Sequence, residues 1–233
     1  QQSRRDEMDR GREAPREHRR DQECLERAPR LLGPEHPDPS GVELTEAGYV
    51  APHWPRPWGL DADPILQIVI DEELKRAGVR RPNNQIGIGW AGPTIVHAGT
   101  PDQQARYLPK ILSGEEIWCQ LFSEPEAGSD LANLGTRAVR DGDEWVINGQ
   151  KIWTSLAQHS SFGILIARTD PDAPKHAGIT YFVCPMDAPG VEIRPIIEMT
   201  GAHTFNEVFL TDVRLPADHV IGEVNQGWGL AKV

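Results

Sequence analysis

The sequence lacks the features of a membrane-spanning, disulfide-bonded or zinc-binding protein. No apolar run approaches the roughly 18 residues that a membrane helix needs, and the N-terminal residues hold no apolar segment typical of a secretion signal. Cysteine is scarce, and Cys24, Cys119 and Cys184 are widely spaced, with no CxxC pair. This usage is typical of a reducing compartment. We therefore expect a cytoplasmic protein with no membrane span.

An excess of basic charge is also missing. The chain has 24 Lys and Arg against 35 Asp and Glu, which gives a net charge of −11. The two signs nearly balance over residues 1–40, so the remainder of the chain carries almost all of this charge. An acidic body disfavours nonspecific binding to nucleic acid, and we expect no such partner. A single anionic ligand held by local N–H groups remains compatible with this charge.

The pattern of apolar residues divides the chain into four parts. Residues 1–45 are dense in Arg, Glu and Asp and read as a charged, diverged or disordered arm. Residues 46–116 are mainly helical in pattern, and residues 117–216 are a succession of short strands. Residues 217–233 read as the start of a second helical domain without a stop signal, so we expect a chain that is cut short at its C-terminus.

Capping residues predict where the helices begin. Asp63 and Pro64 form an N-cap and first-turn pair, and Gly78 is a credible end for the same helix. Thr100 and Gln103 form a capping box that predicts a helix from Pro101 to about residue 112. A further helix is expected over about 90–98.

A glycine motif in this helical part matches a dinucleotide-binding fingerprint by spacing alone. Residues 87–92 read GIGWAG, which fits GxGxxG. The polar stretch before them is not an apolar strand, and no strand ending in an acid follows at the required distance. We interpret these glycines as positions of close helix packing.

The strand region predicts an α+β fold, in which a helical domain precedes an antiparallel β-sandwich or barrel. Asp141–Gly142 and Asn148–Gly149 are hairpin turn signals. No long helix interrupts the strands, so they are expected to pair antiparallel. The predicted strands cover residues 117–122, 136–140, 144–148, 150–155, 162–168, 179–184, 191–197 and 205–213.

Two stretches of the strand region are candidates for ligand binding. Residues 120–130 are a strand followed by a small-residue loop, whose glycine and N–H groups suit a phosphate; an ordinary turn is the alternative. In residues 148–155, alternation places Lys151, Trp153 and Ser155 on one strand face. An indole beside hydroxyls suits a flat heteroaromatic ring, although a core tryptophan is the alternative. Together the two stretches suit a flavin dinucleotide.

The same stretches resemble the signatures of the acyl-CoA dehydrogenase family, and the organisation is similar to its bacterial, actinobacterial-looking branch. The resemblance rests on CQLFSEPEAGSD at 119–130, INGQKIWTS at 147–155 and FNEVFLTDVRLP at 205–216, in matching order and spacing. It extends over roughly four-fifths of the chain, from about Glu46 onward.

The resemblance implies an FAD-dependent flavoprotein of fatty acid and lipid metabolism that introduces a Cα–Cβ double bond into an acyl-CoA thioester. A glutamate would remove the Cα proton while a hydride leaves Cβ for the flavin. The thioester oxygen would be polarised by hydrogen bonds. The family also implies a C-terminal helical bundle, homo- or hetero-oligomers and electron-transfer flavoprotein as the electron acceptor.

Residue by residue, the resemblance places cofactor contacts in both stretches. The pyrimidine side of the flavin would contact Gln120, Leu121, Phe122 and Ser123. Gly128 and Ser129 would meet the pyrophosphate, with Ser129 also near the substrate pantetheine. Trp153 would cover the flavin face, and Thr154 and Ser155 would bond near N5 and O4. Lys175 and His176 could approach the CoA phosphates, although such loops usually carry solvated charges.

The sequence departs from the family at three places. Glu126 stands where the family usually has glycine; if that position needs a positive φ, the side chain costs about 1–2 kcal/mol and should weaken FAD binding. Residues 1–45 lack the family's first amphipathic helices. The catalytic glutamate of the family would fall beyond Val233, and Glu124, Glu126 and Glu207 are not at positions that the family uses.

Three functions stay open at this point. The first is an acyl-CoA dehydrogenase, whose isolated chain we expect to be inactive. The second is a non-catalytic remnant or a partner subunit of a heteromeric enzyme. The third is an acyl-CoA oxidase-like flavoprotein. The sequence does not distinguish straight-chain, branched and steroid side-chain acyl groups.

Overall fold

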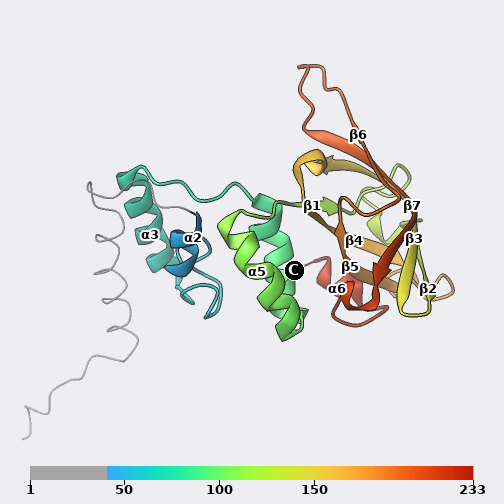
Figure 1. Ribbon diagram of the computed structural model, residues 1–233, viewed down its shortest axis with the longest axis horizontal. Coiled ribbons are helices and arrows are strands. Elements are labelled where there is room, and N and C mark those ends of the chain that lie inside the picture. The colour runs from blue at the N-terminus through green and yellow to red at the C-terminus, as the bar shows by residue number, and fades with distance from the viewer. Residues whose placement is uncertain (1–40, 233) are drawn as a thin grey trace, which may run out of the picture.

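The computed structural model describes residues 41–232, so most of the predicted charged arm lies outside the described residues. Helices come first and strands follow, as predicted (Figure 1). α2 begins inside the range that composition assigns to the arm. None of the helices in the described part could cross a membrane. The helical elements before the sheet are α2 (Gly41–Glu46), α3 (Pro64–Ala77), η1 (Gly87–Ala91), α4 (Gly92–Ala98) and α5 (Pro101–Ser113).

The predicted helix caps are confirmed. The side chain of Asp63 accepts a hydrogen bond from the backbone N–H of Leu66 at 2.8 Å, and Gly78 ends α3 with a φ of 72°. At the start of α5, Thr100 and Gln103 each accept a hydrogen bond from the other's backbone N–H. These local interactions satisfy N–H groups that have no partner within the helix.

The glycine motif at 87–92 forms a helix and not a phosphate-binding loop. Gly87–Ala91 is a π-helical turn that runs directly into α4. A Cβ added at Gly92 would lie only 2.0 Å from the indole of Trp54, which is buried. The interpretation that the motif permits close packing is therefore confirmed at Gly92.

The strands form one eight-stranded sheet in the order β6-β7-β3-β2-β4-β5-β8, with β1 paired to β4. Most pairs are antiparallel, as predicted, but β1 pairs with β4 in parallel and β2 meets β4 in parallel at one position. The intervening β2–β3 hairpin lets β4 return in the same direction as β1. The bounds are β1 (Trp118–Leu121), β2 (Arg137–Asp141), β3 (Glu144–Ser155), β4 (Phe162–Arg168), β5 (Ile179–Pro185), β6 (Val191–Pro195), β7 (Phe205–Pro216) and β8 (Val220–Ile221); α6 (Gly227–Leu230) follows.

Only one of the two predicted hairpin turns exists. Asp141 and Glu144 pair across the turn at Gly142, but β3 continues through Asn148 and Gly149 as one strand of 12 residues. The second prediction is wrong because Asn148 bonds to β7 at Asp212 in both directions, at 3.0 and 2.9 Å. Gly149 instead permits a close approach of the residue that precedes β2, since a Cβ there would lie 2.2 Å from the hydroxyl of Thr136.

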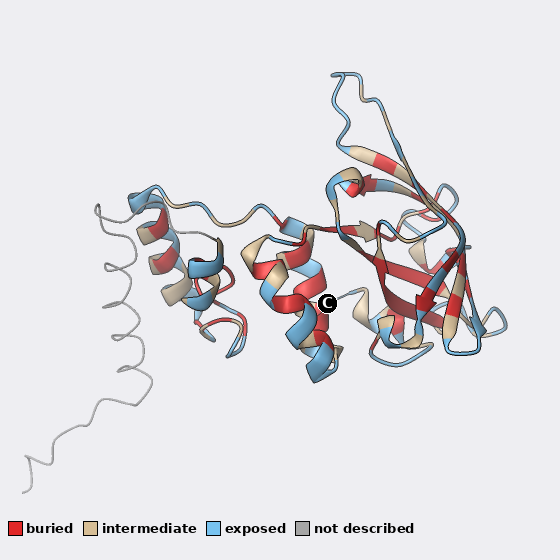
Figure 2. Ribbon diagram, viewed as in Figure 1, coloured by how far each residue is buried: buried red, intermediate tan, exposed pale blue. Residues whose placement is uncertain are grey.

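The molecule has two apolar cores. One lies between the helices and the sheet and includes Ile95, Ile111 and Tyr181. The other is enclosed by the sheet itself. Phe182 on β5 and Val208 on β7 belong to this one buried cluster although their strands are not neighbours in the sheet, so the sheet curls around it. Figure 2 shows buried residues along the inner side of α5 and through the central strands. The curled sheet gives the barrel-like β domain that the strand pattern predicts.

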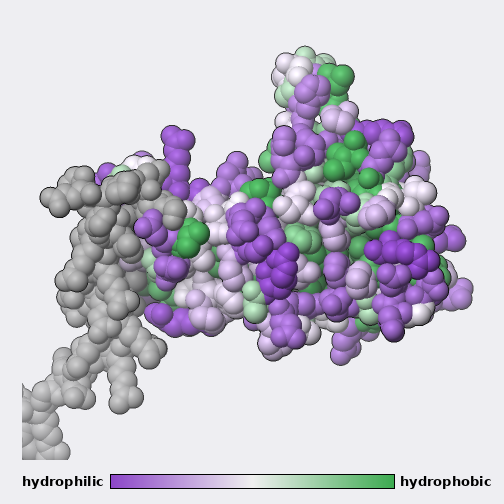
Figure 3. Space-filling model, in the orientation of Figure 1, coloured by the Kyte–Doolittle hydropathy of each residue, from purple (hydrophilic) through white to green (hydrophobic). Residues whose placement is uncertain are grey.

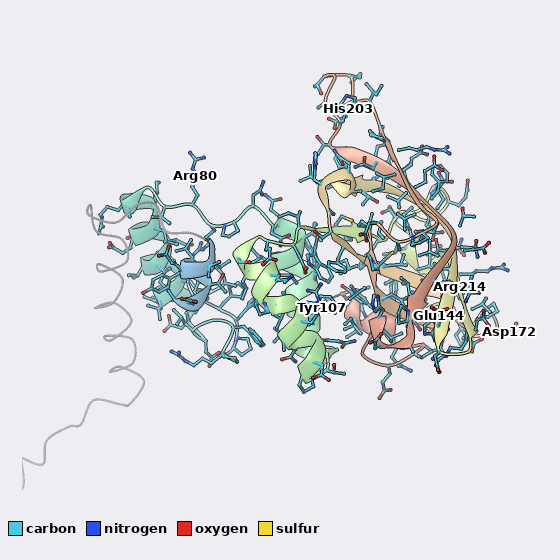
Figure 4. All side chains as sticks on the ribbon, in the orientation of Figure 1. Arg80, Tyr107, Glu144, Asp172, His203 and Arg214 are labelled. Atoms are coloured by element: carbon cyan, nitrogen blue, oxygen red, sulfur yellow. The ribbon has the colours of Figure 1, made fainter. Side chains whose placement is uncertain are left out.

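Aromatic rings join the helical part to the sheet. Tyr107 on α5 packs edge-on against Trp118 and Phe162, with ring centroids 5.4 and 5.5 Å away (Figure 4 labels Tyr107). Such edge-to-face pairs add stabilisation beyond the area that they bury. The first residue of β1, the strand that leads to the candidate site, is thus held by the helical part.

A buried amide makes a second link between the two parts. Gln103 on α5 donates to the carbonyl oxygens of Asp218 and Val220, at 2.7 and 2.8 Å. These carbonyls belong to the last segment of the β domain. Residues more than 100 positions apart in the sequence are therefore fastened together.

Replacing Gly92 by alanine should destabilise the protein by about 1–3 kcal/mol, because the added methyl group must displace a buried indole. Gly89→Ala is the matched control, since a Cβ at Gly89 meets no atom within 4 Å. Urea unfolding of both variants checks the difference. Equal unfolding midpoints for Gly92→Ala and wild type would contradict this packing.

Candidate functional site

The first candidate stretch leaves β1 with its side chains mostly turned into the protein. Leu121 is fully buried in the core of the β domain, and Phe122 packs edge-on against Tyr181. Gln120 and Ser123 are half-buried. A ligand along this edge would meet the side chains of Gln120 and Ser123. At Leu121 and Phe122, whose side chains are buried, it would meet backbone groups.

The loop that follows is a tight turn with an accessible outer part. Glu124 and Ala127 exchange two backbone hydrogen bonds, at 2.9 and 3.1 Å. Gly128 and Ser129 are exposed, and a Cβ added at Gly128 would meet nothing within 4 Å. The loop thus offers open space beside a glycine and a hydroxyl, as a phosphate-binding loop requires.

Glu126 does not strain this loop. It is exposed at the tip of the turn, and it is not among the residues with positive φ. The expectation of a steric penalty at this position is wrong because the turn places Glu126 in an ordinary backbone conformation. Its negative charge near the loop is the remaining difference from a glycine.

The second candidate stretch contains an irregular backbone at Trp153. Its φ is 61°, a left-handed value that is a genuine outlier for a bulky residue. The register between β3 and β7 shifts between Lys151 and Thr154. The predicted alternation of faces is therefore wrong: Lys151 and Thr154 are both fully buried, whereas Trp153 is 59% exposed.

The hydroxyls next to Trp153 differ in their surroundings. The Oγ1 atom of Thr154 is buried without a hydrogen-bond partner among the described residues. The backbone carbonyl oxygen of Thr154 accepts a hydrogen bond from the buried side chain of Asn206 at 3.0 Å. Ser155 is half-buried, so its hydroxyl is the more accessible of the two.

A backbone hydrogen bond brings the two candidate stretches together. The N–H of Ile152 donates to the carbonyl oxygen of Ser123 at 2.9 Å. The end of β1 and the bulged end of β3 are thus neighbours, with the exposed indole of Trp153 one residue away. The residues of both stretches therefore border one region of the surface.

A buried ion pair lies beneath this contact, and the motif interpretation did not assign it a role. The ammonium of Lys151 donates to Glu124 Oε1 at 2.8 Å. Burial lowers the pKa of Lys151 from 10.5 to about 8, although Glu124 opposes this shift. Burial acts to raise the pKa of Glu124, but Lys151, Thr136 and Gly135 outweigh it and hold that pKa below 4.5. The lysine of β3 and the glutamate of the Ser-Glu-Pro turn are opposite charges within the two candidate stretches, and this is the sequence signal that could have indicated the pair.

The β6–β7 hairpin borders Trp153 on one side. Trp153 packs edge-on against Phe205, with ring centroids 6.0 Å apart. The hairpin projects from the body, with His203 labelled near its tip (Figure 4). Ile197 and Met199 in this hairpin are exposed, and Figure 3 shows apolar atoms at the projection.

The loop that carries Lys175 and His176 lies beside the glycine loop. Lys175 forms an ion pair with Asp130, directly after Ser129, and His176 contacts Trp228, with ring centroids 5.0 Å apart. A neighbouring cavity of about 380 Å³ is lined by residues that include Arg137, Arg168 and Lys175. The charged side chains that line this cavity are all cationic, although Lys175 is paired with Asp130 and Arg168 donates to three backbone carbonyls.

A helical domain followed by a mainly antiparallel β domain, with these two stretches side by side, is the architecture of the first two domains of an acyl-CoA dehydrogenase. Sequence models of that family match the chain over residues 21–115 for the N-terminal domain and 119–213 for the middle domain. The chain belongs to the acyl-CoA dehydrogenase family. The first match begins within the range that composition assigns to the charged arm.

Curated relatives support the same conclusion. The chain is 55% identical over 191 residues to acyl-CoA dehydrogenase FadE34 of Mycobacterium tuberculosis, covering 82% of this chain and 27% of FadE34. It is 46% identical over 189 residues to acyl-CoA dehydrogenase IpdE1 of the same organism, covering 81% of this chain and 49% of IpdE1. The chain thus spans half or less of the length of these relatives.

Solved structures with the same fold include heteromeric members of the family. The structure of the Tcur3481–Tcur3483 steroid ACAD matches at 38% identity and a TM-score of 0.73, over 91% of this chain and 55% of that chain. The ChsE4–ChsE5 complex from Mycobacterium tuberculosis matches at 33% identity and a TM-score of 0.71, over 94% and 59%.

The ion pair predicts a specific pH dependence of stability. The native pKa of Glu124 lies below its ordinary value, so its ionisation stabilises the fold above about pH 4.5 and this contribution is lost as the pH falls through the native pKa. Near about pH 7, Glu124→Gln should lower the free energy of unfolding by about 3–5 kcal/mol, because Lys151 is left buried and unpaired. The deficit should shrink on acidification.

Urea unfolding between about pH 7 and pH 2 measures both quantities, and the deficit should shrink only below about pH 4.5, where Glu124 of the wild type becomes protonated. Glu126→Gln is the matched control, because Glu126 is exposed on the same turn. A deficit that stays constant over this range would show that Glu124 does not contribute through its charge.

Proposed function

We propose that this chain forms the cofactor-binding part of an FAD-dependent acyl-CoA dehydrogenase, which converts an acyl-CoA thioester to the enoyl-CoA. The contact between Ser123 and Ile152 carries the proposal, because it unites the two stretches that resemble the flavin-binding signatures. The strained and exposed Trp153 supports it further. Residues held in unusual backbone conformations cluster at functional sites, where the surrounding structure over-determines them.

The chain's residues would hold the cofactor from three sides. The exposed indole of Trp153 would cover the face of the ring system. Ser155, more accessible than Thr154, would bond near N5 and O4. Backbone groups of Leu121 and Phe122, with the side chains of Gln120 and Ser123, would meet the pyrimidine edge, while Gly128 and Ser129 would contact the pyrophosphate. FAD bound here would supply the hydride acceptor.

The substrate would approach along the glycine loop. Ser129 is exposed next to the cavity that Arg137, Arg168 and Lys175 help to line. Guanidinium and ammonium groups suit the phosphates of CoA. The pantetheine would then pass Ser129 on its way to the ring system.

The base that removes the Cα proton would come from outside the described residues. Glu124 is engaged by Lys151 and by two backbone N–H groups, and Glu207 accepts a hydrogen bond from Gln150. The buried Glu124 carboxylate is therefore fully engaged, and Glu207 lies at a position that the family does not use for the base. A further helical domain, on the same polypeptide or on a partner subunit, would supply the glutamate.

We favour a heteromeric assembly with electron-transfer flavoprotein as the electron acceptor. Similarity to the Tcur3481–Tcur3483 and ChsE4–ChsE5 complexes supports the first part. CoA thioesters of steroid-derived acyl groups are the substrate class that the first of these structures suggests. An oxidase-like reaction is the alternative, and release of hydrogen peroxide during turnover in air would favour it.

Removing the indole at Trp153 should weaken FAD binding. Stacking of an aromatic side chain on a ring is worth about 1–3 kcal/mol, so Trp153→Ala should raise the Kd for FAD by about 5- to 150-fold. Quenching of flavin fluorescence during titration measures this. Trp90→Ala, at an exposed tryptophan of the helical part, is the control. Equal losses for the two variants would place the flavin elsewhere.

Catalysis should require a helical domain in addition to this chain. The DNA that follows the codon for Val233 is sequenced. The chain is then expressed alone, and together with the helical domain encoded downstream or in an adjacent open reading frame. An acyl-CoA should bleach the flavin absorbance near about 450 nm only in the second sample, since only that sample contains the base. Bleaching of the chain alone would refute an external base, and bleaching of neither sample would refute dehydrogenation.

A further inference from the structure

The contacts of Lys151 extend well beyond a simple ion pair. Its ammonium has three donors and uses all of them: Glu124 Oε1 at 2.8 Å, the carbonyl of Phe122 at 3.1 Å and the carbonyl of Ile166 at 3.0 Å. Phe122 directly follows β1 in the first candidate stretch, and Ile166 lies on β4. One buried atom therefore fixes three backbone segments relative to one another.

Glu124 extends the same network in the opposite direction. Its Oε2 atom accepts from the N–H of Gly135 at 2.6 Å, and its Oε1 atom accepts from the N–H of Thr136 at 3.0 Å. The glycine loop is thereby anchored where it begins and where the chain enters β2. The exposed Gly128 and Ser129 lie between these anchors.

We propose that Lys151 and Glu124 are positioning residues of the cofactor site, which hold the glycine loop and the Trp153 strand at a fixed separation. This inference rests on the proposed function, since it assigns the pair to that site. Neither side chain reaches the surface of the site, so the pair acts through the backbone segments that it bonds. It is not a catalytic pair.

The backbone of Trp153 explains why such a device is needed. A left-handed conformation is unfavourable for a residue with a side chain and persists only where neighbouring contacts enforce it. Lys151 is anchored on one side of Trp153, and the carbonyl of Thr154 is anchored by Asn206 on the other. The exposed indole is thus presented by a segment that is fixed at both ends.

A positioning role and a purely stabilising role of the pair predict different effects on fold stability and on ligand affinity when the pair is replaced. Apolar or neutral residues of similar size often replace a buried ion pair without loss of stability, whereas removal of one partner is costly. A neutral pair can therefore preserve the fold while it loses the directional bonds of the ammonium to Phe122 and Ile166. A site loosened in this way would bind its ligand less well although the protein stays folded.

The test compares the double variant Lys151→Met with Glu124→Gln against wild type. Circular dichroism and urea unfolding report the fold, and titration reports the Kd for FAD. We expect a folded protein with a Kd raised by about tenfold and an altered absorbance band of the bound flavin. The matched control is Arg106→Met with Glu116→Gln, which neutralises a bidentate pair at the helical junction and should leave the Kd within about twofold. A folded double variant with wild-type flavin affinity and spectrum would overturn the proposal.

Hydrogen exchange gives a reading that does not depend on FAD. The amide of Ile152, which bonds to Ser123, should exchange at least about tenfold faster in the double variant, while amides of α5 should not change. Unchanged protection of Ile152 would also overturn the proposal. Faster exchange in a chain whose wild type binds no FAD would refute the proposed function and leave the positioning of the two segments intact. Lys151→Met with Glu124→Leu, which replaces the pair by two apolar side chains, carries the same comparisons if the first double variant does not fold.

Discussion

The ammonium of Lys151 is the constraint around which the β domain is arranged. A charge with no access to water must be fully hydrogen-bonded, because its desolvation otherwise costs several kcal/mol. Its partners come from the end of β1, from the loop after it and from β4. The same requirement that makes this core self-consistent therefore aligns the two stretches that resemble the family's flavin-binding signatures. The hydrogen bonds that satisfy the buried ammonium of Lys151 thus also determine the relative position of the two candidate stretches.

The helical part follows closely from the sequence because its signals are local. Asp63, Thr100 and Gln103 satisfy N–H groups within a single turn, so the neighbouring residues determine where each helix starts. The hairpin predicted at Asn148–Gly149 fails for the opposite reason. Asn148 finds its partner on β7, 64 positions later in the chain, and this tertiary contact overrides the turn preference of the dipeptide.

The candidate site shows the same division between local and distant information. The motifs identified Trp153 and the glycine loop, and the structure places the two stretches next to each other. They did not reveal the bulge that exposes Trp153 while burying both Lys151 and Thr154, because strict alternation assumes a regular strand. Nor could they reveal that Glu126 has an ordinary backbone conformation, since this depends on the paired Glu124 and Ala127 beside it.

The buried amide of Gln103 has a consequence for how the molecule unfolds. It links the beginning of α5 to the final segment of the β domain through two hydrogen bonds. Contacts between such distant parts of a chain form only after most of the intervening residues have found their places. Together with the ring contacts of Tyr107, these two bonds couple the stability of the helical part to that of the sheet, although the two parts are separate in sequence.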